Sequence, residues 1–143
     1  MKVKVQFSEN LHFKASTRHF KNINIDEPES FHGTDLGPSP IEYFLMGIGG
    51  CIGATFAYCL QRKNGSIKKL EIIVDGKMRH IPPDLHLKLI QIDIKIDFSL
   101  KGSISKDIIE NCKLKFQKYC PITDSIANGI PVNIKFSDSN FVY

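Results

Sequence analysis

The chain has 143 residues, of which 24% are charged and 42% hydrophobic, and its formal net charge is +4. This length and composition are typical of one globular domain, so we expect a single domain over residues 1–143 rather than a disordered chain. The lysines and arginines are scattered, and without a basic cluster to neutralise phosphates we expect no nucleic-acid partner. The four cysteines and five histidines show no metal-ligand spacing, so the sequence predicts no metal site and no cofactor.

The first forty residues are typical of short strands followed by a loop. Residues 3–7 carry an apolar side chain at every second position, and residues 11–15 and 20–25 form two further short strand-like runs. No apolar region of a signal peptide is present at this start, so we expect a protein of the reducing cytoplasm, where thiols persist. Residues 26–40 are dense in Asp, Gly, Pro and Ser, which indicates a loop.

A long apolar segment predicts one helix that begins after Ser39 and ends near Lys63. Ser39 and Glu42 have the spacing of a capping box, and Pro40 suits the first helical position. Residues 43–60 carry no charge, which meets the length threshold for a membrane-spanning helix. Because both flanking regions resemble strands of a water-exposed sheet, we expect a helix buried within the protein and no membrane partner.

Four glycines interrupt this helix, at positions 47, 49, 50 and 53. Each costs about 1 kcal/mol relative to Ala in a helix, so their presence needs a reason. Glycine allows another segment to approach a helix very closely. We therefore predict a tight neighbour for this helix, and we expect that neighbour to be another helix.

The second half of the chain returns to strands. Residues 69–75 and 90–98 alternate apolar and polar side chains, which predicts two strands joined by a hairpin connection at residues 79–84. A helix is expected from about residue 105 to 118, and a last strand over residues 130–136. The separation of strand runs from helices predicts an α+β fold with antiparallel sheets.

The four cysteines form two pairs, and each pair is spaced by eight residues. For Cys59 and Cys112 we favour the interpretation that each is a small buried apolar side chain. Cys120 precedes Pro121, the expected start of a short helix that ends at Asn128-Gly129, so it would be the N-cap of that helix. The positive end of a helix dipole lowers a thiol pKa and favours the nucleophilic thiolate. A chance cap remains the alternative.

Cys51 lies in the middle of the long helix, where no helix end activates it, so it needs a cation from elsewhere. Gly49 and Gly50 remove side chains beside its sulfur and could leave room for a substrate. The alternative is a packed, unreactive thiol. Charged partners are few: Arg18, Arg62 and Arg79 are the three arginines. Glu42 lies about 13 Å from Cys51 along the helix, and its place in the capping box already accounts for a glutamate at this position.

Two segments carry a resemblance to a known family. Residues 37–51, Gly-Pro-Ser-Pro-Ile-Glu-Tyr-Phe-Leu-Met-Gly-Ile-Gly-Gly-Cys, resemble the helix-opening segment of the OsmC/Ohr family, which leads to its first cysteine. Residues 118–122, Lys-Tyr-Cys-Pro-Ile, resemble the second cysteine motif of that family. The distance between the two motifs and the order of the elements match as well, so the resemblance covers nearly the whole chain.

The resemblance implies an intertwined homodimer with antiparallel sheets around long central helices, so that the close neighbour of the glycines would be the helix of the partner chain. It also implies a thiol peroxidase that reduces organic hydroperoxides, with Cys51 as the peroxidatic and Cys120 as the resolving cysteine. A dithiol reductant of lipoyl or thioredoxin type would reopen the resulting disulfide.

Two further residues take roles through the same resemblance. Arg18 lies in the region where the family supplies its arginine. Glu42 is one residue beyond the position of the glutamate that orients this arginine, where the chain has Ile41. This departure favours an alternative function, a non-catalytic dimer that binds a small apolar ligand at the subunit interface.

Overall fold

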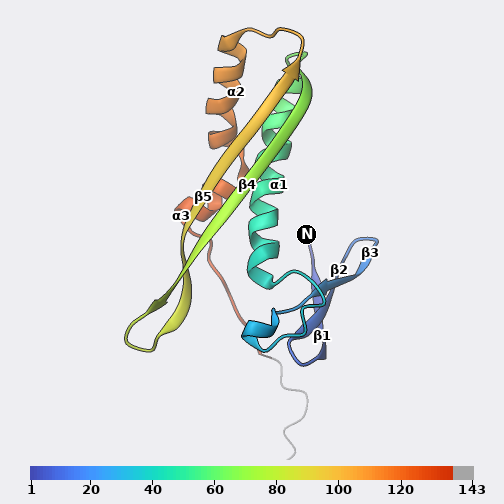
Figure 1. The fold of residues 1–143 in the computed structure, drawn as a ribbon, viewed down its shortest axis with the longest axis vertical. Coiled ribbons are helices and arrows are strands. Elements are labelled where there is room, and N and C mark those ends of the chain that lie inside the picture. Colours follow the sequence, from blue (N-terminus) through green and yellow to red (C-terminus); the bar gives the residue numbers. More distant parts are fainter. Residues whose placement is uncertain (137–143) are drawn as a thin grey trace, which may run out of the picture.

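A three-stranded antiparallel meander opens the chain. Its strands are β1 (Lys4–Glu9), β2 (His12–Thr17) and β3 (Phe20–Ile25), in that spatial order. The structure is a computed structural model and describes residues 1–136 (Figure 1). The three short strands expected from the alternating N-terminal residues are confirmed.

The loop after β3 is held by a buried carboxylate. Asp26 is fully buried, and its Oδ2 accepts hydrogen bonds from the hydroxyl of Thr34 at 2.6 Å and from the backbone N–H of Leu36 at 3.1 Å. The hydrogen bond from the Thr34 side chain is the main reason that the pKa of Asp26 lies below its usual value. A short 3-10 helix, η1 (Glu29–Phe31), lies within this loop. These hydrogen bonds therefore fix the loop that precedes the long helix.

The long helix, α1 (Pro40–Gln61), begins as predicted. The Glu42 carboxylate accepts a hydrogen bond from the Ser39 backbone N–H at 2.7 Å, and the Ser39 hydroxyl accepts one from the Glu42 N–H at 3.3 Å, which completes the capping box. Four residues spaced by four form its fully buried stripe: Ile48, Ile52, Phe56 and Leu60. By length and composition α1 could cross a membrane, but the core helix of a water-soluble protein meets the same criterion.

A long two-stranded ribbon packs diagonally across α1 (Figure 1). Its strands are β4 (Ser66–Ile81) and β5 (His86–Lys101), both longer than predicted. The expected hairpin connection was too long, because residues 79–81 still pair with β5 and only residues 82–85 form the turn.

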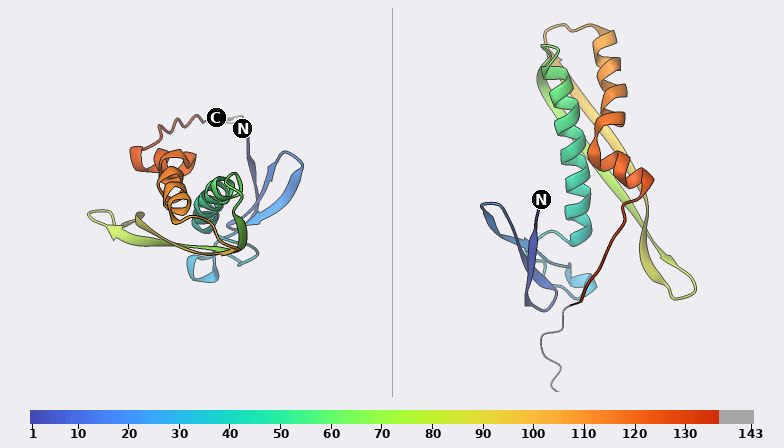
Figure 2. Two further views of the ribbon diagram at one scale, coloured as in Figure 1. Left: turned by 90° about the horizontal axis from the view of Figure 1, so that it is seen from above. Right: turned by 180° about the vertical axis from the view of Figure 1, so that it is seen from behind.

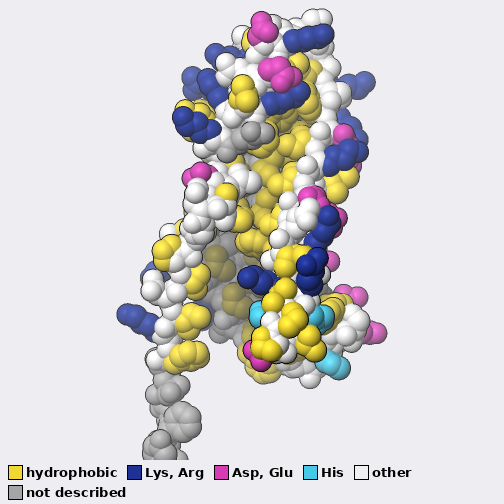
Figure 3. All heavy atoms as spheres, turned by 90° about the vertical axis from the view of Figure 1, so that its left-hand side faces the viewer, with side chains coloured by type: hydrophobic (Ala, Val, Ile, Leu, Met, Phe, Trp, Pro, Cys, Tyr) yellow, Lys and Arg dark blue, Asp and Glu magenta, His cyan; other side chains and the backbone are white. Residues whose placement is uncertain are grey.

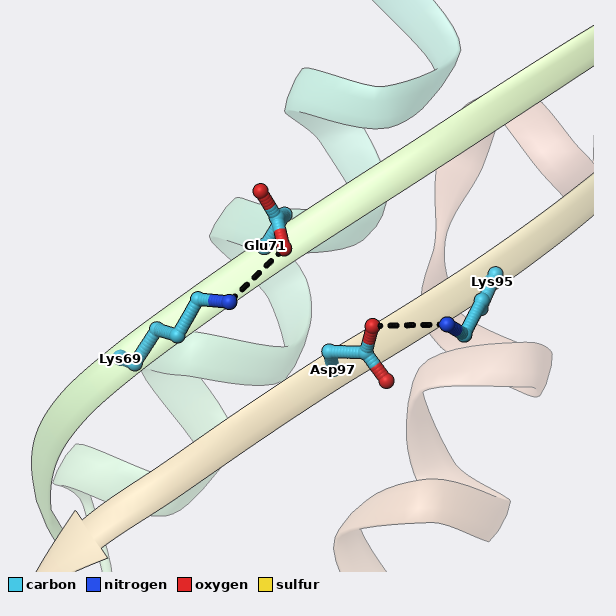
Figure 4. A network of polar contacts seen from close by, with 4 residues as sticks. All are labelled: Lys69, Glu71, Lys95 and Asp97. Atoms are coloured by element: carbon cyan, nitrogen blue, oxygen red, sulfur yellow. Dashed lines mark hydrogen bonds and ion pairs between the residues drawn. The ribbon is translucent and has the colours of Figure 1, made fainter.

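One face of the ribbon carries exposed ion pairs. Lys69 binds Glu71 at 2.8 Å on β4, and Lys95 binds Asp97 at 3.1 Å on β5, with the helices behind the ribbon in the view of Figure 4. Pairs of this exposure contribute little to stability. Their value is to keep this face of the ribbon in water, so that the apolar face turns toward the helices.

Two helices follow and lie on the same side of the ribbon as α1, as the view from above shows (Figure 2). Helix α2 (Lys106–Tyr119) runs antiparallel to α1, and α3 (Pro121–Asn128) begins after a one-residue break at Cys120. Both helices were predicted. The mixed α+β architecture with antiparallel sheets is likewise confirmed.

The strand predicted over residues 130–136 is absent from the structure. These residues have no regular secondary structure, and the four alternating apolar side chains at 130, 132, 134 and 136 are 63% to 89% exposed. The segment leaves α3 and runs away from the ribbon (Figure 2). Alternation determines which side chains share a face, but a strand also needs a neighbouring edge with which to pair its backbone.

The glycine prediction needs a correction as well. A Cβ atom added to Gly53 would lie 2.9 Å from Ile72, and one added to Gly49 would lie 3.1 Å from Val74. The close neighbour of these two glycines is therefore strand β4 of the same chain and not a helix. Gly47 and Gly50 differ, because an added Cβ would meet nothing within 4 Å at either position.

Candidate functional site

The structure brings Cys51 and Cys120 together although 69 residues separate them. Cys51 lies in the middle of α1, and Cys120 lies between α2 and α3, which pack against α1 (Figure 1). The two Sγ atoms are 3.4 Å apart, within reach of a hydrogen bond between a thiol and a thiolate. Neither cysteine is in a disulfide.

The environments of the two sulfurs differ. Cys120 is fully buried and forms a core cluster with Ile48 and Ile52, whereas Cys51 is half-buried. Burial raises the pKa of the Cys51 thiol, and the neighbouring Cys120 raises it further. Burial also acts against ionisation of Cys120, but polar hydrogens of Thr123, Cys51 and the Ile122 backbone outweigh it, so the pKa of Cys120 falls below its ordinary value.

Cys120 occupies the predicted N-cap position of α3, with Pro121 as the first helical residue. The capping is weaker than expected: the Ile122 and Thr123 N–H groups lie close enough to lower the thiol pKa, but none makes a cap hydrogen bond to the sulfur. The hydroxyl of Thr123 donates to the carbonyl oxygen of Cys120 at 3.3 Å, which holds the helix start in place. The expectation of an acidic Cys120 thiol from the sequence therefore agrees with its surroundings.

Two thiols at this distance titrate as one unit. When the pair loses one proton, the negative charge rests mainly on Cys120, the sulfur with the more favourable surroundings. Transfer of the remaining proton across the 3.4 Å contact would place the thiolate on Cys51 instead. The pair can therefore present a nucleophile at the half-buried position and keep a second thiol in reach of it.

The two other candidate residues do not join this pair within the single chain. Glu42 is in the first turn of α1, and its carboxylate binds Ser39, which lowers its pKa. Arg18 lies in the turn between β2 and β3, and its guanidinium stacks 5.3 Å from the ring centroid of Phe20. No hydrogen bond links Arg18 to Cys51 among residues 1–136.

The other two cysteines were misjudged from the sequence. Cys59 and Cys112 form a disulfide with an S–S distance of 2.07 Å, which joins α1 to α2. The spacing of the cysteines contained this information. In two antiparallel helices, a residue eight positions later in one helix faces a residue eight positions earlier in the other. If Cys51 meets Cys120, then Cys59 meets Cys112. Reading each cysteine alone as a buried apolar side chain missed this register.

The model of the family described as OsmC-like protein matches residues 33–135 of this chain. The chain belongs to the OsmC-like family. The matched segment contains all four cysteines and every element from α1 to α3. An uncharacterised protein of Methanocaldococcus jannaschii is 32% identical over 98 residues, which are 67% of the chain. The OsmC-like chain spans about half of that relative, 48% of its length.

Solved structures share the OsmC-like fold. An OsmC-like protein from Mycoplasma pneumoniae superposes with a TM-score of 0.73 at 23% identity, over 88% of this chain and 86% of that chain. The organic hydroperoxide resistance protein OhrB of Bacillus subtilis superposes with a TM-score of 0.57 at 17% identity, over 87% of both chains. At these identities the likeness establishes the fold.

Proposed function

We propose that this OsmC-like protein is a cysteine-based peroxidase that reduces organic hydroperoxides in the cytoplasm. The observation that carries the proposal is the 3.4 Å contact between the sulfurs of Cys51 and Cys120, two unbonded cysteines from distant parts of the chain. Proteins named for organic hydroperoxide resistance share the fold, which supports the same chemistry.

Cys51 is the attacking cysteine in this proposal because it is the accessible one. Cys120 is more acidic but fully buried, so a hydroperoxide reaches Cys51 first. Proton transfer from Cys51 to Cys120 supplies the thiolate. Arg18 would act as the activating cation, and the Glu42 carboxylate would orient it. Both roles require an assembly of chains that brings these side chains to Cys51.

The reaction balances with two thiols and one hydroperoxide. The Cys51 thiolate attacks the terminal oxygen of the peroxide, the O–O bond breaks, and the alkoxide leaves as an alcohol after taking a proton. Cys51 becomes a sulfenic acid. The Cys120 sulfur then attacks Cys51, the S–S bond forms, and hydroxide leaves as water after protonation. A dithiol reductant restores both thiols by exchange.

The functional unit that we propose is a homodimer. In the single chain α1 still exposes large apolar side chains near its N-terminal end, among them Phe44 and Met46. Gly50 borders a hollow of about 400 Å³ between α1 and β4, and no described residue beyond the adjoining turns of α1 lies within 4 Å of a Cβ placed there. A helix of a second subunit would cover this surface and use the space that the glycines leave.

Replacing Gly50 by Leu should disrupt this assembly. The wild type should sediment at micromolar concentration with twice the mass of one chain. The leucine side chain would be forced into the contact, and overpacking of this kind typically costs about 1–3 kcal/mol. Gly50→Ala is the matched control and should disturb the dimer less, because its side chain is a single methyl group. A Gly50→Leu dimer with unchanged thermal stability would contradict the proposed contact.

The test of the activity is direct. The reduced protein is mixed with an organic hydroperoxide or with hydrogen peroxide, and the loss of free thiols is followed over time. We expect faster thiol loss with the organic hydroperoxide, together with a mass change that corresponds to one new disulfide per chain. Unchanged thiols after exposure to both peroxides would reject the proposed activity.

One observation favours the alternative, a dimer that binds a small apolar ligand. Between α1, β5 and α3 lies a cavity of about 410 Å³, lined largely by apolar side chains such as Phe44, Ile48 and Ile92. Glu42 is engaged in the capping box rather than with an arginine. Binding of a fluorescent apolar probe without any thiol loss on peroxide treatment would select this function.

A further inference from the structure

We infer that the Cys59–Cys112 disulfide is a second reducible centre, and that the cavity beside it binds a small thiol with negative charge. The inference is independent of the peroxidase proposal, because it involves neither Cys51 nor Cys120. It starts from an observation that the proposed mechanism leaves unused, a disulfide between the C-terminal half of α1 and the middle of α2. In the reducing compartment that we expect for this protein, a disulfide is normally a reversible link.

Only one sulfur of this disulfide is open to attack. Cys59 is half-buried and lines a cavity of about 350 Å³ between the two helices, whereas Cys112 is 1% exposed and sits in a core cluster with Phe56 and Leu60. An incoming thiolate would therefore reach the sulfur of Cys59 and displace that of Cys112. A cavity of this size holds a small molecule but not a protein loop.

The charge of the cavity selects the kind of thiol. Arg62, Lys63 and Lys115 line it, and no carboxylate among the described residues does. None of the three cations forms an ion pair within residues 1–136. Three unpaired cations around one sulfur attract an anionic molecule and stabilise a thiolate, the reactive form of the incoming thiol.

Aromatic side chains form the remaining walls. Tyr58 accepts a hydrogen bond from Nη1 of Arg62 at 3.3 Å, and the guanidinium lies 5.9 Å from its ring centroid, so the cation is held at the cavity edge. Phe116 and Tyr119 contribute from α2. Figure 3, the view onto the left-hand side of Figure 1, shows apolar side chains flanked by lysines and arginines in the upper part of the molecule.

The second centre is separate from the first. Eight residues along α1 correspond to about 12 Å, too far for a sulfur of one pair to attack the other pair. Electrons therefore cannot pass between the pairs by direct exchange in this conformation. Each pair needs its own access for a reductant, and the cavity at Cys59 provides it for the second pair.

The exchange balances with two thiols. The first thiolate attacks Cys59, a mixed disulfide forms, and Cys112 leaves as a thiolate that takes a proton. A second thiolate attacks the sulfur of the bound thiol, and Cys59 leaves in turn. Two thiols are oxidised to one small disulfide, and the protein pair gains two electrons and two protons.

The test compares 3-mercaptopropionate, an anionic thiol, with cysteamine, a cationic one. The protein carries Cys51→Ser and Cys120→Ser, so that only the second pair reacts. Each rate of reduction is divided by the rate of the same thiol with an uncharged disulfide peptide. We expect the corrected rate to be roughly 10-fold higher for the anionic thiol. If the doubly substituted chain folds poorly, peptide mapping of the wild type follows the reduction of the Cys59–Cys112 disulfide instead.

Charge variants identify the cavity as the cause. Arg62→Gln combined with Lys115→Gln should remove most of the preference for the anionic thiol. Lys113→Gln is the matched control: Lys113 lies on the same helix but binds Glu110 at 2.7 Å, so the preference should persist. Equal corrected rates for both thiols, or the same loss of preference in Lys113→Gln as in the Arg62→Gln/Lys115→Gln variant, would overturn the inference.

Discussion

Cys51→Ser should abolish the consumption of organic hydroperoxide. Serine has the same shape as cysteine but is a far weaker nucleophile at neutral pH, so the first step cannot occur. The substitution is nearly isosteric at a half-buried position, and the fold should persist. The measurement is the rate of peroxide loss in the presence of a dithiol reductant, with circular dichroism to confirm the folded state.

Cys120→Ser should behave differently, because it leaves the first step intact. The variant should consume one equivalent of hydroperoxide and leave a sulfenic acid at Cys51 that a dimedone-type reagent can trap. Without the resolving sulfur 3.4 Å away, it should then stall or oxidise further. The wild type should instead yield a Cys51–Cys120 disulfide in non-reducing peptide maps.

The opposite pattern would reverse the roles. If Cys120→Ser loses the first reaction and Cys51→Ser keeps it, the more acidic but buried thiol is the nucleophile, and acidity outweighs access. If both variants consume peroxide like the wild type, the peroxidase proposal is wrong. The Cys59 and Cys112 peptides in the same maps report the state of the second pair separately.

The largest loss of stability is expected for Leu60→Ala. Leu60 is fully buried in the cluster with Phe56 and Cys112, between α1, α2 and the ribbon. Removing a buried leucine side chain typically costs about 2–5 kcal/mol, because apolar contact is lost and a cavity remains. Helix propensity favours Ala slightly, so the cost reflects packing alone. Urea unfolding followed by circular dichroism measures it.

Leu114→Ala is the matched control for this substitution. Leu114 lies on α2 with 70% of its surface exposed, so the same chemical change should alter the free energy of unfolding by no more than about 0.5 kcal/mol. Equal losses for the two variants would show that the cluster around Leu60 does not form the core, or that Leu114 is covered by a second subunit.

Local patterns in the sequence were sufficient for most elements of the fold. The capping box at Ser39 and Glu42 predicted the start of α1, because it depends on residues three apart in the chain. The period-two alternation predicted β4 and β5, and Cys120-Pro121 predicted the break between α2 and α3. The two family motifs likewise singled out Cys51 and Cys120, but the sequence alone could not bring their sulfurs to 3.4 Å.

Tertiary structure decided the features that depend on contacts between residues far apart in the chain. Residues 130–136 alternate as a strand does but find no strand edge within the described chain, so their backbone stays unpaired. Gly49 and Gly53 mark a close approach, yet only packing shows that β4 is what approaches. Cys59 and Cys112 each look like small apolar residues, and only the antiparallel register of α1 and α2 places their sulfurs within bonding distance. A sequence pattern encodes a residue's own preferences, whereas a contact depends on two surfaces that meet after folding.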